Sequence, residues 1–374
     1  MVTRKLNSVI NGYLFKNKTI ILYGARQTGK TTLIHQLLDK IDVKVLIMNA
    51  DEQDIRELFS DFNPKKLLPY ITDQRILLID EAQRLNEAGL VLKIIHDNYK
   101  ELQLIVTGSS SFDLANSTKE PLTGRKFEFT LYPFSFAEMT DYHGFLTEKR
   151  LIEHRMIFGY YPDIALNIGK EVKLLKSLAS SYLYKDLLIL GTIKKPVLLE
   201  KILKALALQI SNEVSYNELA QLLSSDKETI EKYIDLLEKT GIIFRLEGFS
   251  RNLRNEIKRN RKIYFYDNGI RNAVLGNFTH LNSRTDAGAL WENYMVSERI
   301  KYLEYNEIEA GKYFWRTTQK QEIDYIEERQ DMLYAFEFKW NPAKKPSVSK
   351  TFIKNYPNNE FKVIHPGNFH EFLM

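Results

Sequence analysis

The first third of the chain alternates short apolar runs with segments of helical periodicity. The apolar runs lie at residues 19–23, 43–48, 75–79 and 102–107 and have the length of buried strands. Between them, residues 31–40 and 86–99 carry apolar side chains at three- and four-residue spacing, as amphipathic helices do. Strands that alternate with helices predict a parallel sheet covered on both faces, so we expect an α/β domain at residues 1–135.

Residues beyond 135 have mainly helical patterns until strand patterns return near the C-terminus. We expect a helical region at 136–196, a winged helix-turn-helix module at 197–261 and a second α/β domain at 262–374. The module is predicted from a helix at 197–211, a second helix that Ser215 caps, a third helix at 226–239 and a strand at 242–249.

The segment after the first predicted strand has the spacing of a phosphate-binding loop, a glycine followed after four residues by Gly-Lys-Thr. Lys30 would carry positive charge to the β- and γ-phosphates, and Thr31 would ligate Mg²⁺. A strand before the loop and a helix after it are the expected context. We therefore predict ATP and Mg²⁺ as cofactors, and a nucleotide-binding set of Gly24, Ala25, Arg26, Gln27, Thr28, Gly29, Lys30, Thr31 and Thr32.

Two carboxylates follow the apolar run at 76–79. Asp80 at the strand end would hold Mg²⁺ through water, and Glu81 would polarise the water that attacks the γ-phosphate. Downstream of a phosphate loop, this pattern is typical of a Walker B element with its catalytic base. The predicted activity is ATP hydrolysis.

Three further residues are candidates for this site. Ser109, with Thr107 as the second choice, follows the strand at 102–107 and would contact the γ-phosphate or the attacking water; the alternative is an ordinary turn. Arg125 is a candidate arginine finger or sensor, the alternative being a loop arginine without a catalytic role. A finger that acts on a neighbouring subunit would require a homo-oligomer.

The order of these motifs resembles that of a prokaryotic AAA-type ATPase family. The resemblance is carried by the loop at 24–31, by Leu-Ile-Asp-Glu-Ala-Gln at 78–83, by Thr-Gly-Ser-Ser at 107–110 and by Leu-Thr-Gly-Arg at 122–125. It continues through the segments at 159–162, 182–186 and 262–269. Members of this family carry a C-terminal domain of unknown function similar to restriction-endonuclease-type nucleases. The resemblance implies an AAA-type ATPase domain and a nuclease-like C-terminal domain.

A basic stretch follows the predicted helix-turn-helix. Residues 245–262 contain seven Lys or Arg residues and two Glu residues, whereas the third helix of the module mixes both signs. Such a stretch is where a wing would meet DNA phosphates. The alternative is a module that packs against protein, with a solvated basic loop.

Carboxylates also gather on two predicted strands near the C-terminus. If Gln330 and Asp331 form the hairpin turn, Asp324 faces Glu337 across the strands, and Lys339 shares the face of Glu337. This pattern resembles that of PD-(D/E)XK nucleases, in which Mg²⁺ assists phosphodiester hydrolysis. Asp324, Glu337 and a further carboxylate, Glu292, are the predicted metal ligands. A salt-bridged surface hairpin and a nuclease fold that does not cut are the alternatives.

The composition excludes several kinds of site and several classes of protein. The chain has no Cys, which excludes disulfides, thiolate nucleophiles and thiolate zinc sites, and its formal net charge is only +5. No run approaches the roughly 18 apolar residues of a membrane helix, so we expect a cytoplasmic protein. The leading hypothesis is an ATPase whose nucleotide cycle controls a DNA-acting, nuclease-like domain. The alternative is an ATP-dependent switch that binds protein or DNA without cutting.

Overall fold

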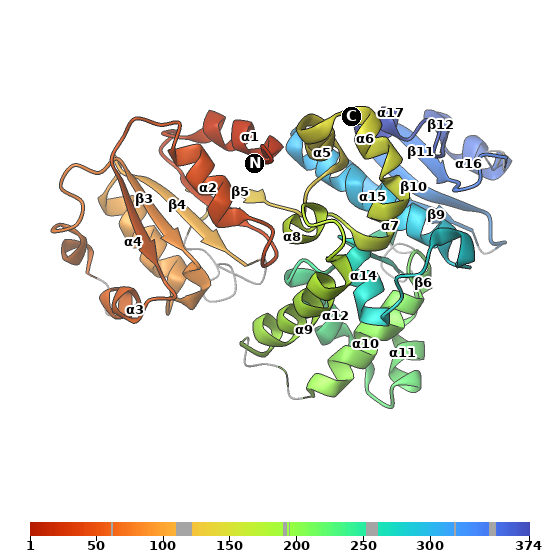
Figure 1. Ribbon diagram of the computed structural model, residues 1–374, viewed down its shortest axis with the longest axis horizontal. Helices are drawn as coiled ribbons and strands as arrows, with labels where there is room; N and C mark the ends of the chain where they lie inside the picture. The colour runs from red at the N-terminus through yellow and green to blue at the C-terminus, as the bar shows by residue number, and fades with distance from the viewer. Residues whose placement is uncertain are drawn as a thin grey trace. The chain divides into compact units, whose positions relative to one another are not determined.

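The computed structural model describes residues 1–60, 63–109, 122–189, 193, 195–251, 261–317, 319–343 and 349–374, with the backbone alone for 181–189. These residues form two compact units. The first comprises residues 1–133 and 239–241, and the second residues 134–238 and 242–374. Figure 1 shows the course of the chain through them.

The first unit is built on a parallel sheet, as the alternation of strands and helices predicts. Its strands in the described part are β1 (Thr19–Tyr23), β2 (Val45–Asn49), β3 (Ile76–Asp80), β4 (Gln103–Gly108) and β5 (Lys126–Thr130), in the spatial order β2-β3-β4-β1-β5. Its helical segments are α1 (Lys5–Tyr13), α2 (Lys30–Leu38), α3 (Gln53–Ser60), α4 (Ala88–Asn98) and two short 3₁₀ turns, η1 (Pro64–Leu67) and η2 (Ala82–Arg84).

The strand order decides which side chains meet at one edge of this sheet. Because the strands are parallel, their carboxyl ends lie together, and β4 stands between β1 and β3. Residues that follow β4 therefore lie between the loop after β1 and the carboxylates after β3.

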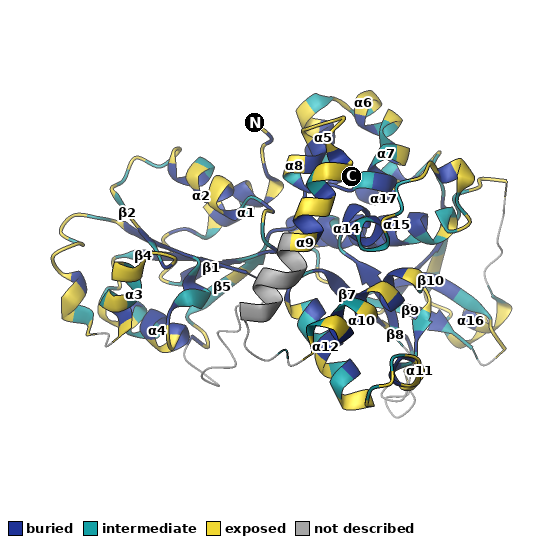
Figure 2. Cartoon of the chain, turned by 60° about the horizontal axis from the view of Figure 1, so that its bottom comes forward, coloured by how far each residue is buried: buried dark blue, intermediate teal, exposed yellow. Residues whose placement is uncertain are grey.

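The strands of the first unit lie in an apolar core. Every residue of β3 and β4 is buried, as are the first four residues of β1 (Figure 2). Side chains of α4, such as Val91, Leu92 and Ile95, pack against Leu77, Leu104 and their neighbours in one apolar cluster. Burial on both faces explains why these strands are continuous apolar runs instead of alternating patterns.

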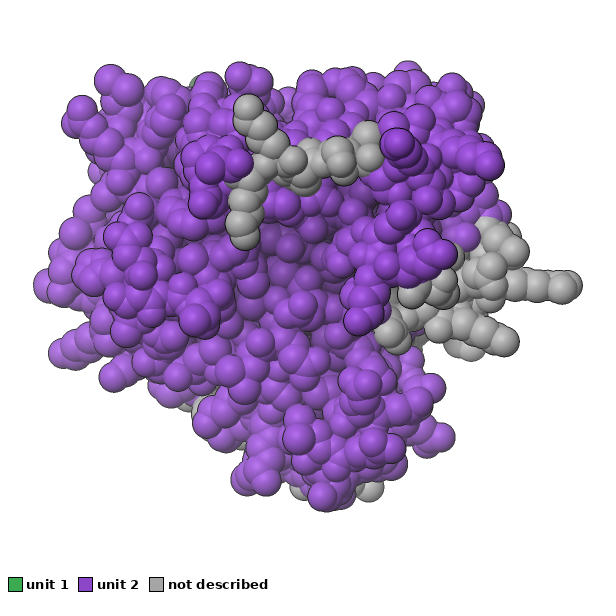
Figure 3. Space-filling view, turned by 90° about the vertical axis from the view of Figure 1, so that its right-hand side faces the viewer, with its two compact units in different colours: residues 1–133, 239–241 green, residues 134–238, 242–374 purple. Residues whose placement is uncertain are grey.

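The second unit combines helices with one mixed sheet. Its helical elements are α5 (Phe136–His143), α6 (Phe145–Arg150), α7 (Ile152–Phe158), α8 (Pro162–Ala165), α9 (Glu171–Ile189), α10 (Pro196–Leu208), α11 (Tyr216–Leu222), α12 (Lys227–Lys239), α14 (Asn268–Leu275), η3 (Leu281–Ser283), α15 (Ala287–Tyr305), α16 (Lys350–Asn355) and α17 (His370–Leu373). Its strands are β6 (Glu213–Val214), β7 (Ile243–Gly248), β8 (Arg261–Phe265), β9 (Gly311–Arg316), β10 (Glu322–Arg329), β11 (Met332–Phe338) and β12 (Asn359–Ile364). Figure 3 shows one face of this unit in a space-filling view.

The sheet of the second unit runs through two of the predicted domains. Its strand order is β12-β11-β10-β9-β7-β8-β6, and β7 pairs in parallel with β9 through Glu247–Tyr313 and Gly248–Phe314. The helices and strands predicted for residues 197–249 are present as α10, α11, α12 and β7. The predicted domain boundary at 261, however, falls on the first residue of β8, inside this sheet.

The Gly-Tyr-Tyr-Pro loop at 159–162 forms a structural junction within the second unit. The Tyr160 N–H donates to Asp267 Oδ2 at 2.6 Å, and Asp267 Oδ1 accepts from the Ile270 N–H at 3.1 Å as the N-cap of α14. Gly159 has a φ of 75°, and a Cβ there would lie 2.1 Å from Asp267 Oδ1. Only glycine therefore fits beside this buried carboxylate.

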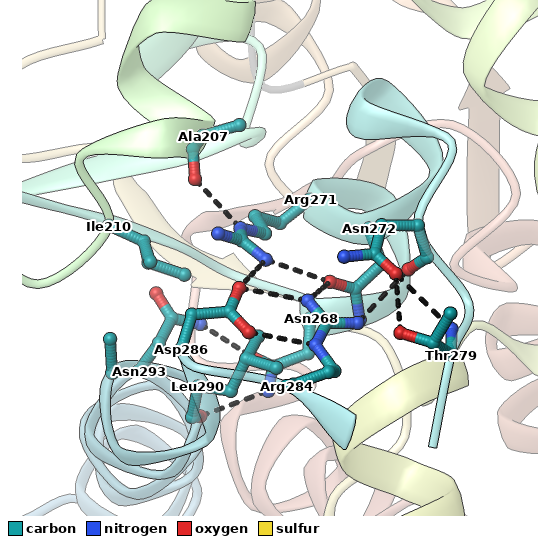
Figure 4. Close-up of polar contacts among 12 residues, drawn as sticks. Ala207, Ile210, Asn268, Arg271, Asn272, Thr279, Arg284, Asp286, Leu290 and Asn293 are labelled. Atoms are coloured by element: carbon teal, nitrogen blue, oxygen red, sulfur yellow. Dashed lines mark hydrogen bonds and ion pairs between the residues drawn. The ribbon is translucent and has the colours of Figure 1, made fainter. Parts of the chain in front are cut away.

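A second junction joins α10, α14 and α15 (Figure 4). Arg271 Nη1 and Arg284 Nε donate to the two oxygens of Asp286 at 2.6 and 2.8 Å, and Arg271 Nε donates to the Ala207 carbonyl at 2.8 Å. Both arginine side chains are almost fully buried. The single carboxylate thus satisfies two buried guanidinium groups at the start of α15.

Candidate functional site

The phosphate-loop motif spans the turn from β1 into α2. Gly29 is the N-cap residue of α2 and has a φ of 93°, a left-handed conformation that favours glycine. The Lys30 ammonium donates to the carbonyl oxygens of Gly24 and Ala25 at 2.8 and 3.3 Å. Lys30 is buried, whereas Thr31 and Thr32 are exposed. The loop therefore combines a helix N-terminus with a held positive charge, as a phosphate site requires.

Asp80 lies directly beside this loop. The Thr31 hydroxyl donates to Asp80 Oδ2 at 3.1 Å, and the Thr107 hydroxyl donates to Asp80 Oδ1. Asp80 is itself buried. Hydroxyl and carboxylate oxygens are the donors that Mg²⁺ prefers, so Thr31 and Asp80 fit this ion.

Glu81 is held by the ends of β3 and β4. Its backbone N–H lies 3.2 Å from both Asp80 Oδ1 and the Thr107 hydroxyl oxygen, and its φ of 55° is left-handed. Its carboxylate accepts a hydrogen bond from the Gln83 amide, whose oxygen accepts from the Ser109 N–H at 3.4 Å. The sequence predicts Ser109, or Thr107 as the second choice, at this site. In the structure, the side chain of Thr107 contacts Asp80.

The N-terminal arm supports the loop through a residue that the motif analysis missed. Arg4 is buried, and its guanidinium donates to the Thr28 carbonyl at 2.8 Å and to the Tyr132 carbonyl at 2.6 Å. It therefore links the phosphate loop to the segment after β5. No spacing rule connects Arg4 with a loop 24 residues later, so only the fold reveals this contact.

Arg125 lies at the opposite edge of the sheet. It precedes β5, its carbonyl accepts from the Thr19 N–H at 2.8 Å, and Thr19 is at the amino end of β1. Its guanidinium donates to Asp97 at 2.9 Å. The structure therefore does not bring Arg125 to the nucleotide site of its own chain, and an action on a neighbouring subunit stays a prediction.

The C-terminal hairpin has the register that the sequence predicts. Arg329 pairs with Met332 and Tyr325 with Phe336, and both turn residues, Gln330 and Asp331, have positive φ as two-residue type I′ turns need. β10 also shifts register against β9 between Ile323 and Ile326, beside Asp324. Bulges of this kind re-aim side chains next to functional sites.

Asp324, Glu337 and Lys339 meet at the end of this hairpin. Lys339 Nζ lies 3.3 Å from Asp324 Oδ2 and 2.5 Å from Glu337 Oε2, and Asp324 Oδ2 also accepts from the Phe338 N–H at 2.9 Å. Burial, followed by the nearby Asp324 charge, raises the pKa of Glu337 to about 7, although Lys339 opposes the shift. Two carboxylates and an ammonium in contact can bind a cation and position a water molecule.

Glu292 approaches the same cluster but is already paired. Its Oε1 accepts from Lys262 Nζ at 3.0 Å and from the Tyr264 hydroxyl at 2.7 Å. Lys262 also forms an ion pair of 2.6 Å with Glu322. Burial raises the pKa of Glu292 to about 7 against the opposing charge of Lys262.

The predicted three-carboxylate metal set does not assemble. Within the described ranges, no group of three or more His, Cys, Asp and Glu side chains is arranged to hold a metal ion. Asp324 and Glu337 fit a cation as a pair, because both carboxylates reach the same ammonium. Glu292 does not fit as their third ligand, since its charge is paired with Lys262, and Lys262 and Tyr264 both occupy its Oε1.

The basic stretch at 245–262 is only partly described, and its described cations contact other side chains of the second unit. Arg245 forms ion pairs with Asp235 and Glu238, and Arg261 with Glu247. Arg251 lies 5.7 Å from the centre of the Tyr356 ring. The remaining basic residues of the stretch, Arg254, Lys258 and Arg259, lie outside the described residues. Lys262, predicted to face DNA phosphates, instead points into the acidic cluster.

Comparison with protein families divides the chain into three matched segments. Residues 16–140 match the family described as AAA domain. Residues 16–140 form an AAA-type P-loop domain. Residues 149–281 and 287–371 match two families described as domains of unknown function, DUF8612 and DUF4143. The expected nuclease likeness of the C-terminal domain is not among these matches.

Relatives similar over most of the chain come from bacteria and archaea. A protein of Haemophilus influenzae is 22% identical over 94% of this chain and 89% of its own length. One from Mycobacterium tuberculosis is 25% identical over 95% of this chain and 78% of its own length. One from Methanocaldococcus jannaschii is 24% identical over 86% of this chain and 74% of its own length. All three carry the name "uncharacterized protein".

Among solved structures, similarity is found to the RuvB Holliday junction branch migration motor of Thermotoga maritima. It is 18% identical, with 65% of this chain and 90% of that one covered at a TM-score of 0.32. Cdc6p of Pyrobaculum aerophilum is 12% identical, and the match covers 74% of this chain and 93% of that one at a TM-score of 0.31. In the part of the chain that the structure describes, no helix is long and apolar enough to cross a membrane.

Proposed function

We propose that the first unit binds ATP with Mg²⁺ and hydrolyses it. The observation that carries this proposal is the contact of Thr31 with Asp80 at 3.1 Å, with Glu81 fixed beside them. This contact joins the loop after β1 to the end of β3, which is the arrangement that nucleotide hydrolysis uses. The match of residues 16–140 to the AAA domain family supports it independently.

Each side chain has a separate task in this reaction. Lys30 would neutralise the β- and γ-phosphates, and Thr31 and Asp80 would hold Mg²⁺, which would offset the charge that develops on the phosphate oxygens. Glu81 orients the attacking water and accepts its proton. Gln83 and Thr107 fix the position of the Glu81 and Asp80 carboxylates, and Arg4 supports the phosphate loop through its hydrogen bond to the Thr28 carbonyl.

The test of this site is nucleotide binding by Lys30→Ala. Removing the ammonium leaves the phosphates without their cation, so titration with a fluorescent ATP analogue should show no measurable binding. Lys16→Ala, an exposed lysine of the same unit, is the matched control and should bind as the wild type does. Wild-type affinity in Lys30→Ala would refute the site.

We further propose that the second unit acts on DNA through Asp324, Glu337 and Lys339, under control of the nucleotide cycle. Support comes from the buried carboxylate pair and the ammonium in contact with both. Asp324 and Glu337 would hold one divalent ion, which would stabilise the charge on the phosphate being cleaved. Lys339 would then orient the water for attack.

One observation favours the second candidate, an ATP-dependent switch that binds DNA or protein without cutting. Among the described residues, Glu292 is paired with Lys262 and Tyr264, and no group of three or more carboxylate or histidine side chains is arranged to hold a metal ion. A poorly held ion would leave a nuclease-like cluster without activity.

A cleavage assay separates the two candidates. Linear, supercoiled and single-stranded DNA would be incubated with Mg²⁺ or Mn²⁺, with and without ATP, with the wild type, Asp324→Ala and Lys30→Ala. Cleavage that is lost in both variants would support an ATP-controlled nuclease. Intact ATP turnover with no cleavage under any condition would instead support the switch.

A further inference from the structure

We propose that Lys262 is a built-in cation of the acidic cluster in the second unit. It holds Glu292 and Glu322, so that the cluster takes a single divalent ion, at Asp324 and Glu337. This inference rests on the proposed role of Asp324 and Glu337 and deepens it, because it sets how many ions the site binds. It also gives Lys262 a role different from contact with DNA phosphates.

The ammonium of Lys262 lies between two carboxylates. Its Nζ is 3.0 Å from Glu292 Oε1 and 2.6 Å from Glu322 Oε1. The Tyr264 hydroxyl, from the same strand β8, donates to the same Glu292 oxygen at 2.7 Å. Glu292 therefore has its charge and one oxygen satisfied by groups of this chain.

The position of Lys262 is fixed by burial. Its side chain is 2% exposed, and its Nζ lies 5.5 Å from the centre of the Phe314 ring on β9. If the ammonium left its partners, the largely buried Glu292 carboxylate would lose its counter-charge, so the ammonium remains in place.

Lys339 differs from Lys262 in its exposure to solvent. Its side chain is 25% exposed, and it contacts both Asp324 and Glu337. A flexible, partly solvated lysine can turn outward when a divalent ion enters. Asp324 and Glu337 are therefore the carboxylates that become available to an ion, and Glu292 and Glu322 are not.

Charge repulsion prevents a second ion from using Glu292. An ion that ligates this carboxylate would lie within a few ångströms of the Lys262 ammonium, at a distance where like charges repel strongly in a buried site. The ammonium thus occupies the place that a second divalent ion would take.

The test is Mn²⁺ binding by the full chain, followed by isothermal titration and by the shift in Tm. Every protein carries Asp80→Asn, so that the first unit contributes no bound ion. We expect one Mn²⁺ with Lys262 present and two with Lys262→Met. The same Lys262→Met protein should have a Tm lower by roughly 6–20 °C without Mn²⁺, because a buried pair is broken, and should regain it with Mn²⁺.

Three further variants fix the interpretation. Glu292→Gln should still bind one Mn²⁺ within about threefold of the starting affinity, whereas loss of a true ligand or its support costs about tenfold or more. Lys262→Met/Glu292→Gln should recover stability without Mn²⁺, because the unpaired charge is gone. Lys312→Met removes a lysine of a surface ion pair with Glu304 and should change neither measurement.

Each result has a distinct consequence. Loss of Mn²⁺ binding in Glu292→Gln, or one ion of unchanged affinity in a folded Lys262→Met, would overturn the role of Lys262. If Lys262→Met does not fold, the Glu292→Gln titration decides alone. Retained Mn²⁺ binding in Asp324→Ala would instead refute the metal site itself, and with it the proposed function of the cluster.

Discussion

Asp80 shows how one side chain can organise a reaction centre. Its two oxygens accept hydrogen bonds from Thr31 and Thr107, so it connects the phosphate loop after β1 with the end of β4. A buried carboxylate with both oxygens engaged has a fixed orientation. The hydroxyl of Thr107 therefore positions Asp80.

Thr107→Val tests this positioning role. Valine keeps the shape of threonine but removes the hydroxyl, so Asp80 loses one fixed partner. We expect kcat to fall about tenfold and half-maximal activity to require more Mg²⁺, while the KM for ATP stays near its original value. Steady-state ATPase assays over a Mg²⁺ series provide the measurement. Thr72→Val, at an exposed threonine of the same unit away from the phosphate loop, is the control; an unchanged Mg²⁺ dependence in Thr107→Val would exclude the role.

Some of these residue assignments could be predicted from the sequence, and others could not. Lys30, Thr31 and Asp80 follow from motif spacing along a few residues and are brought together as predicted. The choice between Thr107 and Ser109 depended on the last residue of a strand, which sequence patterns locate only to within a residue or two. Arg4 and Lys262 act on residues far along the chain, where no spacing rule applies.

At the level of elements, the β10–β11 hairpin was the most predictable feature of the second unit. Strand alternation and a two-residue turn fix which residues oppose each other, and the observed register agrees. The Gly-Tyr-Tyr-Pro loop was less predictable, because its partner, Asp267, lies more than 100 residues later. Its glycine serves the junction with α14.

Gly159→Ala is expected to weaken this junction. The added Cβ meets the Asp267 carboxylate at 2.1 Å and forces an alanine into a left-handed conformation, so we expect a loss of about 2 kcal/mol or more in free energy of unfolding. Gly169 has a similar φ of 94°, but a Cβ there would meet nothing within 4 Å. Gly169→Ala therefore measures the backbone strain alone, without the steric clash that Gly159→Ala adds. Urea unfolding measures both, and equal losses in the two variants would argue against the collision.

Asp286→Asn tests the junction of α10, α14 and α15. Burial acts to raise the pKa of Asp286, but hydrogen bonds from Arg284 and Arg271 hold it at about 2, below the usual 3.8. Its folded pKa is depressed, so its contribution is complete above about pH 4 and is lost as the pH falls toward 2. With allowance for solvent screening, we expect the wild type to lose about 1–2 kcal/mol across this range through Asp286.

The asparagine variant should lack that part of the pH dependence and be less stable at pH 7, because two buried guanidinium groups lose their anion. Denaturant unfolding between pH 2.5 and 7 gives both numbers. Identical pH profiles for the wild type and Asp286→Asn would show that the carboxylate does not stabilise this junction.

On the scale of the whole molecule, the sequence described the first unit better than the second. Strand–helix alternation is a local signal, and it predicted a parallel sheet with its motifs at the correct edge. The second unit depends on β7 pairing with β9, two strands about 65 residues apart in the chain, and no local pattern identifies that partner. The predicted domain boundary at 261 therefore fell within a single sheet.

The central claim is that the first unit hydrolyses ATP with Glu81 as its base, and one comparison tests it most directly. ATP affinity and turnover would be measured for the wild type, Glu81→Gln and Glu101→Gln, whose exposed carboxylate precedes the amino end of β4. We predict turnover at least about 100-fold lower in Glu81→Gln with ATP still bound, and no change in Glu101→Gln. Normal turnover in Glu81→Gln would contradict the assignment of the base and the proposed mechanism of the site.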